Sequence, residues 1–162
     1  MVRINAIRIR RARAEDAPAL RGLAIRSKRH WGYADSLIAL WRDDLSFTAE
    51  AIARKTVLVA EHGGRVLGIV AVNVAGTMAE LEDLWIDPDF MGRGLGRRLF
   101  YEGLDLAKAA QVKTLSVVSD PNAEGFYLRM GARRVDMVPS RPDGRGLPRL
   151  ELALGPSEKA TA

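Results

Sequence analysis

A glycine-rich turn constrains this chain more than any other segment. The apolar run that ends at Ile86 predicts a strand, and the pattern after Leu95 predicts a helix to about residue 110. The glycines between them are Gly92, Gly94 and Gly96. Such a turn points several backbone N–H groups at one spot at the helix N-terminus, which favours an anion. Arg93, Arg97 and Arg98 add positive charge, although glycines that only make a tight turn would give the same pattern.

The turn matches neither of two common phosphate-binding patterns. The P-loop pattern GxxxxGK[ST] is absent from the chain. The dinucleotide fingerprint GxGxxG needs a third glycine, where this chain has Arg97, counted from Gly92, or Leu99, counted from Gly94. An anion other than those two ligands is therefore expected at the turn.

The apolar patterns predict one α/β domain (α+β, with a mixed sheet) flanked by helices. The expected strands cover residues 6–12, 56–60, 66–74, 78–86, 114–118, 132–138 and 147–154. The expected helices cover residues 15–29, 34–44, 48–54, 122–130 and the segment from the glycine turn to about 110. A central sheet of six to seven strands follows. The domain is expected to span 1–162, with its core at about 7–154 and a flexible tail at 155–162.

Composition excludes several classes of site. The chain of 162 residues has no cysteine, which removes disulfides, thiolate metal sites and a cysteine nucleophile. Its two histidines, His30 and His62, are far apart in sequence, so no metal is expected. No apolar run reaches about 18 residues and no signal-peptide pattern is present, so we expect a cytoplasmic protein without a membrane span. The net charge of +5 comes from scattered arginines without interleaved aromatic residues, which makes nucleic acid an unlikely partner.

Two segments carry a resemblance to a known family. The glycine turn resembles the acyl-CoA pyrophosphate loop of the GNAT superfamily of N-acetyltransferases, (Gln/Arg)-x-x-Gly-x-(Gly/Ala), with Met91 in the first position, Gly94 in the fourth and Gly96 in the sixth. Met91 departs from the pattern. The methionine lacks the polar side chain of the Gln or Arg that the pattern has at this position, but the backbone amides of the turn remain. The segment Asp120–Ala132 is similar to the family's Asn…Phe-Tyr-x-x-x-Gly signature. The order of elements resembles the GNAT acyl-CoA N-acyltransferase fold from about Ile7 to Leu154.

The resemblance implies acetyl-CoA as co-substrate, bound in a V-shaped split between the strands near 80–86 and 114–119. It assigns backbone pairing with the pantetheine arm to Leu84, Trp85 and Ile86. It assigns the pyrophosphate to the turn residues Met91, Gly92, Arg93, Gly94, Leu95, Gly96 and Arg97. Asn122 is expected to bond the pantetheine or a neighbouring backbone group, and a plain helix N-cap is the alternative.

The resemblance also points to catalytic residues. Tyr127 is expected to contact the cofactor and to protonate the CoA thiolate, with packing beside Phe126 as the alternative. A carboxylate near the end of the central strand, Glu80 or Glu82, is the candidate base for the acceptor amine. Strand alternation places Asp83 on the other face unless a bulge shifts the parity. Two alternatives remain: the strand carboxylates are only solvated surface groups, or the acceptor amine attacks without help from a protein base.

The resemblance places the acceptor pocket beside the first two helices and the loop before the last strand. Trp31 and Tyr33 are the expected substrate-binding residues, with core packing as the favoured alternative for Trp31. The arginines of the 140–149 loop, Arg141, Arg145 and Arg149, suit an acidic acceptor or a solvated loop.

The expected function is acetyl-CoA-dependent N-acetyl transfer to a primary amine of a small molecule or protein. Two alternatives are a non-catalytic acyl-CoA-binding module and an acetyltransferase that acts on an RNA-linked amine. The resemblance also implies a homodimer as an expectation, with the last strands as its interface.

Overall fold

The computed structural model describes residues 2–41, 47–140 and 143–155. Its strands are β1 (Arg8–Arg11), β2 (Thr56–His62), β3 (Arg65–Ala75), β4 (Met78–Ile86), β5 (Thr114–Val118), β6 (Arg133–Pro139) and β7 (Gly146–Ala153). Its α-helices are α1 (Ala17–His30), α2 (Asp35–Leu40), α3 (Ala49–Arg54), α4 (Leu95–Ala109) and α5 (Glu124–Arg129). Four 3-10 turns are η1 (Ile4–Ala6), η2 (Ala14–Asp16), η3 (Pro88–Phe90) and η4 (Pro121–Ala123).

The strands form one seven-stranded mixed sheet in the order β1-β2-β3-β4-β5-β7-β6. β4 and β5 run parallel, whereas β1–β2, β5–β7 and β6–β7 are antiparallel. This confirms the predicted α/β class and mixed sheet. The prediction for the second helix was too long: α2 ends at Leu40, and residues 42–46 lie outside the described residues.

The chain divides into two compact units, which are described separately. Unit 1 comprises Met1–Ala71 and Asp83–Glu102, and unit 2 comprises Val72–Glu82 and Gly103–Ala162. The expectation of one domain over 1–162 stays a prediction.

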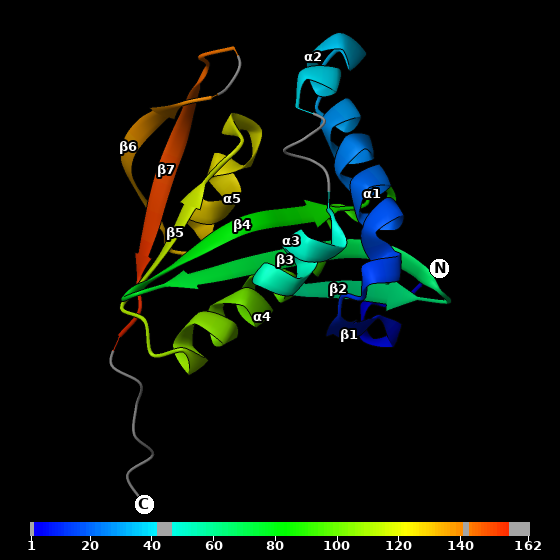
Figure 1. The fold of residues 1–162 in the computed structure, drawn as a ribbon, viewed down its shortest axis with the longest axis horizontal. Coiled ribbons are helices and arrows are strands. Elements are labelled where there is room, and N and C mark those ends of the chain that lie inside the picture. The colour runs from blue at the N-terminus through cyan, green and yellow to red at the C-terminus, as the bar shows by residue number, and fades with distance from the viewer. Residues whose placement is uncertain (1, 42–46, 141–142, 156–162) are drawn as a thin grey trace, which may run out of the picture. The chain divides into compact units, whose positions relative to one another are not determined.

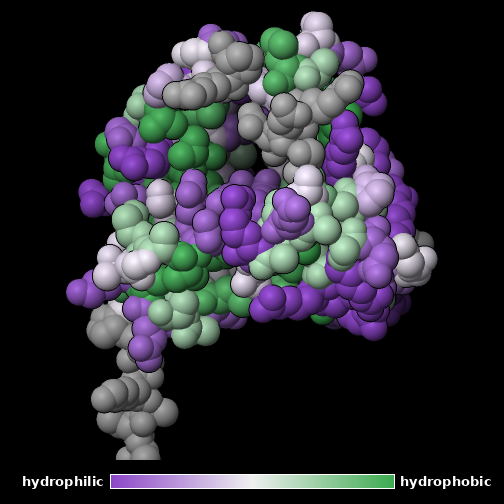
Figure 2. Space-filling model, in the orientation of Figure 1, coloured by the Kyte–Doolittle hydropathy of each residue, from purple (hydrophilic) through white to green (hydrophobic). Residues whose placement is uncertain are grey.

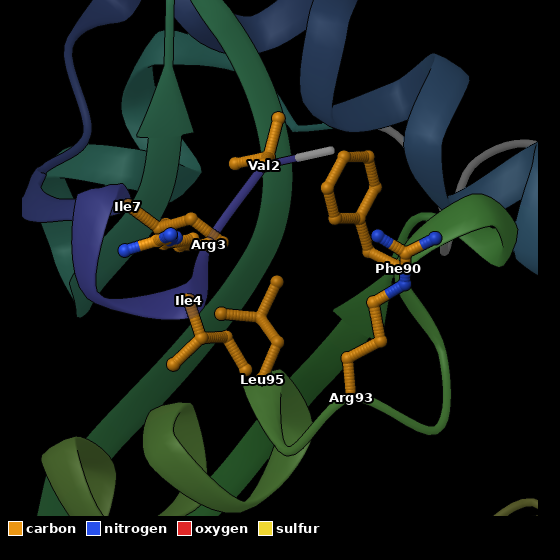
Figure 3. A pocket seen from close by; sticks show the side chains of 7 residues that line it. All are labelled: Val2, Arg3, Ile4, Ile7, Phe90, Arg93 and Leu95. Carbon is orange, nitrogen blue, oxygen red and sulfur yellow. The ribbon is translucent and has the colours of Figure 1, made fainter.

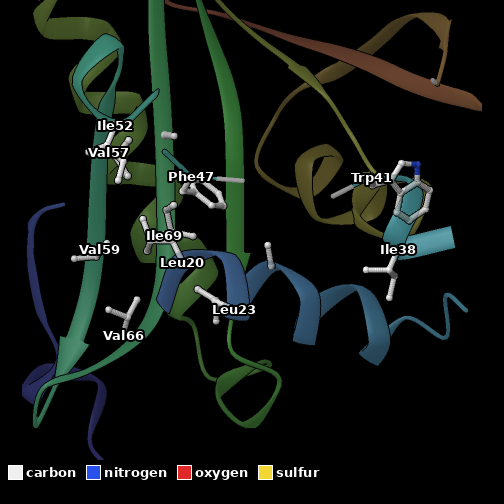
Figure 4. Packing of buried hydrophobic residues seen from close by; sticks show 12 residues of the cluster. Leu20, Leu23, Ile38, Trp41, Phe47, Ile52, Val57, Val59, Val66 and Ile69 are labelled. Carbon is white, nitrogen blue, oxygen red and sulfur yellow. The ribbon is translucent and has the colours of Figure 1, made fainter. Parts of the chain in front are cut away.

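The core of unit 1 lies between α1 and the strands β2 and β3. Figure 4 shows Leu20 and Leu23 of α1 close to Val59, Val66 and Ile69, and all five belong to one buried cluster. Pro18 lies in the first turn of α1, where a missing N–H costs nothing, and Thr48 accepts a hydrogen bond from the Ala51 N–H as the N-cap of α3. These local signals explain the start of α3 next to the predicted residue 48. The helix α1 begins two residues after the predicted residue 15, because residues 14–16 form the 3-10 turn η2.

Unit 2 places α5 beside the last strands. In Figure 1, β5, β6 and β7 lie side by side with α5 next to them. Gly131 follows α5 with a φ of +98°, a left-handed conformation suited to a glycine that ends a helix. Hydrophobic residues show on this part of the surface in the upper left of Figure 2, and Val135 and Met137 of β6 are exposed. The expectation that the last strands mediate a dimer stays a prediction.

Many of the arginines that give the chain its positive net charge form ion pairs. Arg10 binds Glu61 through Nε at 2.7 Å and Asp16 through Nη1 at 2.8 Å, which ties β1 to β2 and to η2. Arg134 pairs with Glu124 across α5 and β6. No helix in the described part of the chain is both long and apolar enough to cross a membrane.

Candidate active site

The glycine turn of unit 1 needs glycine at two positions for its backbone conformation. Gly92 and Gly94 have φ values of +73° and +85°, in the left-handed region that side chains other than glycine rarely adopt. Gly96 differs from its two neighbours, because it is the second residue of α4. Residues 92–94 are exposed, and Gly94 O accepts the Arg98 N–H at 3.1 Å as α4 begins. The first N–H groups of a helix have no partner within it, so this exposed helix start can bind an anion.

Asp87, a buried carboxylate that the sequence patterns did not indicate, fixes the backbone between β4 and this turn. Asp87 is only 1% exposed, and its side chain accepts hydrogen bonds from Arg65 at 2.7 Å, the Asp89 N–H at 3.0 Å and Arg26 at 3.3 Å. Burial raises the pKa of Asp87, but the Asp89 N–H and the two guanidinium groups outweigh it and hold the pKa below its usual range. Asp87 is the N-cap of the 3-10 turn η3, and Pro88 is the first residue of that turn. The Asp-Pro pair could have indicated this cap in the sequence, because Asp is a favoured N-cap and Pro a favoured first helical residue.

Asp87→Asn tests this anchor through the pH dependence of stability. Because the folded-state pKa is lowered, the carboxylate stabilises the fold above the unfolded-state pKa near 3.8, and this contribution is lost as pH falls through the folded-state value. We expect the variant to lose about 2 kcal/mol at pH 7 and to approach the wild type in acid below about pH 4. Urea unfolding across this pH range measures the difference. A constant difference down to pH 2 would contradict the expectation.

The three arginines of the turn have different environments. Arg93 and Arg97 are exposed. The Arg93 guanidinium carbon lies 5.1 Å from the Phe90 ring centroid, and that of Arg97 lies 5.6 Å from the Tyr101 ring centroid. Arg98 instead donates from Nη1 to the carbonyls of Ile4 and Ile7, each at 2.9 Å. Its guanidinium therefore holds the N-terminal turn η1, and the expectation that Arg98 adds positive charge beside the anion stays a prediction.

The strand segment Leu84–Ile86 lies beyond the ladder that joins β4 to β5. That ladder runs from Met78/Thr114 to Glu80/Ser116, whereas β4 continues to Ile86. Within unit 1, the helix α1 holds Ile86 in place, since the Ile86 carbonyl accepts a hydrogen bond from the Ser27 hydroxyl at 2.8 Å.

Trp85 belongs to an aromatic cluster around a buried lysine, which the sequence did not reveal. The Lys28 Nζ lies 4.5 Å from the Trp41 ring centroid, 5.0 Å from that of Tyr33 and 5.2 Å from that of Trp85, and Lys28 is 8% exposed. Cation–π contacts of this kind stabilise a desolvated ammonium. The indole N–H of Trp85 donates a hydrogen bond to the Asp83 carboxylate at 3.3 Å, which fixes the orientation of the ring.

The predicted acceptor residues differ in their surroundings. Tyr33 is half-buried and packs edge-on against Trp41 at 5.1 Å between centroids. Trp31 is 40% exposed and packs edge-on against His30, so the alternative of core packing is wrong for Trp31. Arg149 is a residue of β7 rather than of a loop, and its Nε donates to Asp136 at 2.8 Å. Arg141 lies outside the described residues.

The strand carboxylates occupy different environments. Ala79 and Leu81 are buried, which places Glu80 and Glu82 on the opposite face of β4 as strand alternation predicts. Glu80 is exposed, whereas the partly buried Glu82 accepts a hydrogen bond from the Asn73 amide at 3.2 Å. Asp83 is paired with Lys55 Nζ at 3.0 Å in unit 1.

Unit 2 contains Asn122 and Tyr127. Asp120 is the N-cap of η4, and its carboxylate accepts both the backbone N–H of Asn122 at 2.9 Å and its side-chain amide at 3.0 Å. The alternative of Asn122 as an N-cap is therefore wrong. Tyr127 lies in α5 at 5% exposure, with its ring centroid 5.2 Å from that of Phe126. Among the described residues, no group of three His, Cys, Asp or Glu side chains could hold a metal.

Several known proteins are similar to this chain in sequence or in fold. The N-alpha-acetyltransferase RimI of Mycobacterium tuberculosis is 34% identical over 83 residues, 48% of this chain and 52% of that protein. A crystal structure of the PaiA N-acetyltransferase from Thermoplasma acidophilum with coenzyme A matches with a TM-score of 0.77 and 22% identity, covering 91% of this chain and 99% of that one. A GNAT acetyltransferase from Brucella melitensis in complex with acetyl-CoA matches with a TM-score of 0.62 and 24% identity, covering 93% of this chain and 89% of that one.

The sequence profile of the Acetyltransferase (GNAT) family matches residues 19–132, which include the strand β4, the glycine turn, α4 and the Tyr127 segment. The order of elements and the two left-handed glycines before α4 agree with that match. This chain belongs to the GNAT family of N-acetyltransferases.

Proposed function

We propose that this chain transfers an acetyl group from acetyl-CoA to a primary amine by direct attack in a ternary complex. The observation that carries the proposal is the exposed turn in which Gly92 and Gly94 lead into the 15-residue helix α4. Its backbone N–H groups suit the pyrophosphate of CoA. The loss of a polar side chain at Met91 is tolerable, because backbone amides supply the contacts. The solved neighbours with coenzyme A and with acetyl-CoA support this choice of co-substrate.

The remaining cofactor contacts follow from the resemblance. The backbone of Leu84–Ile86 pairs with the pantetheine arm, because these residues extend beyond the β4–β5 ladder. Asn122 lies exposed next to the N-terminus of α5 and contacts the pantetheine through its side-chain carbonyl, while its amide donates to Asp120. Tyr33, in the aromatic cluster, and the exposed Trp31 contact the acceptor.

Tyr127 protonates the departing CoA thiolate. A thiol has a pKa of about 8.5, so the thiolate is a better leaving group at neutral pH when it receives a proton. A phenol with its ordinary pKa of about 10 keeps its proton at that pH. Tyr127 can then recover a proton from water after the product leaves.

Thermal unfolding with different nucleotides tests the cofactor. Acetyl-CoA at one hundred times its Kd should add about 2.7 kcal/mol to the stability and raise the Tm by roughly 5–10 °C. ATP and NAD at the same concentration should leave the Tm unchanged, because the turn lacks both of their binding patterns. An equal rise with all three nucleotides would indicate non-specific anion binding. No rise with acetyl-CoA would contradict the proposed function.

Glu80 is the proposed base for the acceptor amine. A lysine-like amine with a pKa of about 10.4 arrives protonated, so a carboxylate assists its attack directly or through water. Glu80 is exposed and lies where the resemblance places a base in some family members, whereas Glu82 is partly buried. We expect Glu80→Gln to lower kcat/KM for the amine by roughly 10–100-fold at pH 7, with the defect shrinking as pH approaches the pKa of the amine. Glu82→Gln is the matched control. Unchanged pH profiles for both variants would mean that the amine attacks without a protein base.

An alternative function is acyl-CoA binding without catalysis. The same measurements separate it from the enzyme, because such a module gives the rise in Tm without release of CoA in the presence of any amine. The relative named N-alpha-acetyltransferase RimI favours a panel that includes peptides with a free N-terminal amine beside small amines.

A further inference from the structure

A lysine of the chain itself occupies the centre of the aromatic cluster formed by Tyr33, Trp41 and Trp85. The Lys28 Nζ lies within 5.2 Å of all three ring centroids, and the Trp41 ring is the nearest at 4.5 Å. Several aromatic faces around one cation is the arrangement with which proteins recognise ammonium ligands. In this chain, therefore, a site suited to an ammonium group is filled by a side chain of α1.

The rings keep their places through contacts that do not involve the Lys28 side chain. Tyr33 packs edge-on against Trp41, with 5.1 Å between the ring centroids. Trp41 belongs to the buried cluster of unit 1, against which both Tyr33 and Trp85 pack. The indole N–H of Trp85 donates to the Asp83 carboxylate at 3.3 Å. The three rings should therefore stay in place when the lysine side chain is shortened.

The aromatic cluster is partly accessible to solvent. Lys28 and Trp41 are only 8% and 5% exposed, whereas Tyr33 and Trp85 are partly buried. A molecule that reaches the cluster therefore meets those two rings, and the Lys28 ammonium lies next to them.

The cluster is separate from the pocket of about 560 Å³ beside the glycine turn. Figure 3 shows the N-terminal residues on one side of that pocket and the Phe90–Leu95 segment on the other. None of the residues that line the pocket belongs to the aromatic cluster.

We propose that Lys28 fills the cation site of the acceptor pocket, so that the protein selects primary amines that carry no second positive charge. The inference rests on the proposed function, because that function takes Tyr33 as a contact of the acceptor. A second ammonium group on the acceptor would find the rings already engaged by Lys28. It would also meet a like charge, and like charges repel more strongly where water is excluded. Lys28 thus sets specificity by penalising the wrong acceptor.

Two amines of equal length test this selection. Heptylamine and 1,6-diaminohexane differ only in whether the chain ends in a methyl or an ammonium group. Release of CoA at saturating acetyl-CoA gives kcat/KM for each amine. The wild type should prefer heptylamine by about tenfold or more, and tenfold corresponds to about 1.4 kcal/mol.

The ratio of the two kcat/KM values in each variant isolates the role of Lys28, because a general loss of structure lowers both values together. Lys28→Ala should reduce the preference to about twofold. Lys28→Met removes only the charge and should reduce the preference by a smaller factor. Arg29→Ala is the matched control, since Arg29 is an exposed cation of the same helix end that pairs with Asp35. It should keep the wild-type ratio.

Tetramethylammonium tests the vacated site without turnover. In an NMR titration of the full chain followed through the indole N–H signals, Lys28→Ala should bind tetramethylammonium saturably. The wild type and Lys28→Met should not, because a long side chain still lies among the rings. The neutral tert-butanol, which has a similar size, should bind Lys28→Ala about tenfold more weakly or less.

The outcomes separate this inference from the proposed function. Equal wild-type kcat/KM values for the two amines, or a wild-type ratio in both Lys28 variants, would overturn the inference and leave acetyl transfer intact, because CoA is still released. If neither amine is acetylated, the absence of tetramethylammonium binding to folded Lys28→Ala would overturn it. A wild type that neither binds acetyl-CoA nor releases CoA with any amine would overturn the proposed function, and with it the role of Lys28.

Discussion

Tyr127→Phe should lower kcat by roughly 100-fold at pH 7, a typical contribution of general acid catalysis. The substitution removes one hydroxyl from a side chain that is 5% exposed and leaves the ring in place against Phe126. The KM for acetyl-CoA should change little, because the hydroxyl acts on the thiolate that forms during the reaction rather than on the bound thioester. Release of CoA, measured with a thiol reagent at saturating acetyl-CoA and amine, gives kcat.

The pH dependence distinguishes this role from a structural one. Above the thiol pKa of about 8.5, CoA leaves readily as the thiolate and needs no acid. The difference between the wild type and Tyr127→Phe should therefore shrink as pH rises from 7 to 10. Tyr101→Phe is the matched control, since it removes a phenol hydroxyl from an α4 side chain that is 44% exposed. A Tyr127→Phe enzyme with wild-type kcat would end the assignment of Tyr127 as the acid.

Gly92→Val should raise the KM for acetyl-CoA by at least tenfold. Gly92 has a φ of +73°, and a β-branched residue there is strained although the space around its Cβ position is open. The strain costs about 1–2 kcal/mol in place, and the turn relieves it by rotating the peptide groups that flank residue 92. Those groups carry amides assigned to the pyrophosphate, so rotation removes hydrogen bonds to the cofactor. Steady-state kinetics at saturating amine measures the change.

Gly76→Val separates the loss of binding from the loss of stability. Gly76 has a φ of +61°, also with no atom within 4 Å of its Cβ position, but it lies in the turn between β3 and β4. The two variants should lose similar stability in urea unfolding, and only Gly92→Val should lose affinity for acetyl-CoA. Equal KM values in the two variants would show that the glycine turn does not hold the cofactor.

Local signals in the sequence determined most of the secondary structure. Pro18 and Thr48 fixed the beginnings of two helices through their backbone preferences, and the alternation of Ala79 and Leu81 with Glu80 and Glu82 determined the faces of β4. The prediction for the second helix ran too far, because short amphipathic patterns specify the presence of a helix better than its end.

The glycine turn was visible in the sequence because left-handed backbone conformations demand a particular residue type. Gly92 and Gly94 meet that demand, and two spaced signatures sufficed to identify the family. Trp31 shows the limit of the same reasoning. Its residue type favoured a place in the core, but the end of α1 leaves it exposed beside His30.

Only the tertiary structure decided which charged groups are available for chemistry. Nothing local distinguishes Arg98 from Arg93, yet one is bound to carbonyls more than ninety positions earlier in the chain and the other is exposed at a pocket. Asp87 and Lys28 are buried through partners on distant elements, namely Arg26 and Arg65 for the first and Trp85 for the second. The sequence by itself determined the backbone conformations and the family, because these depend on residue type and spacing. Burial and long-range hydrogen bonds assign the roles of individual side chains, because they exist only after distant segments pack together.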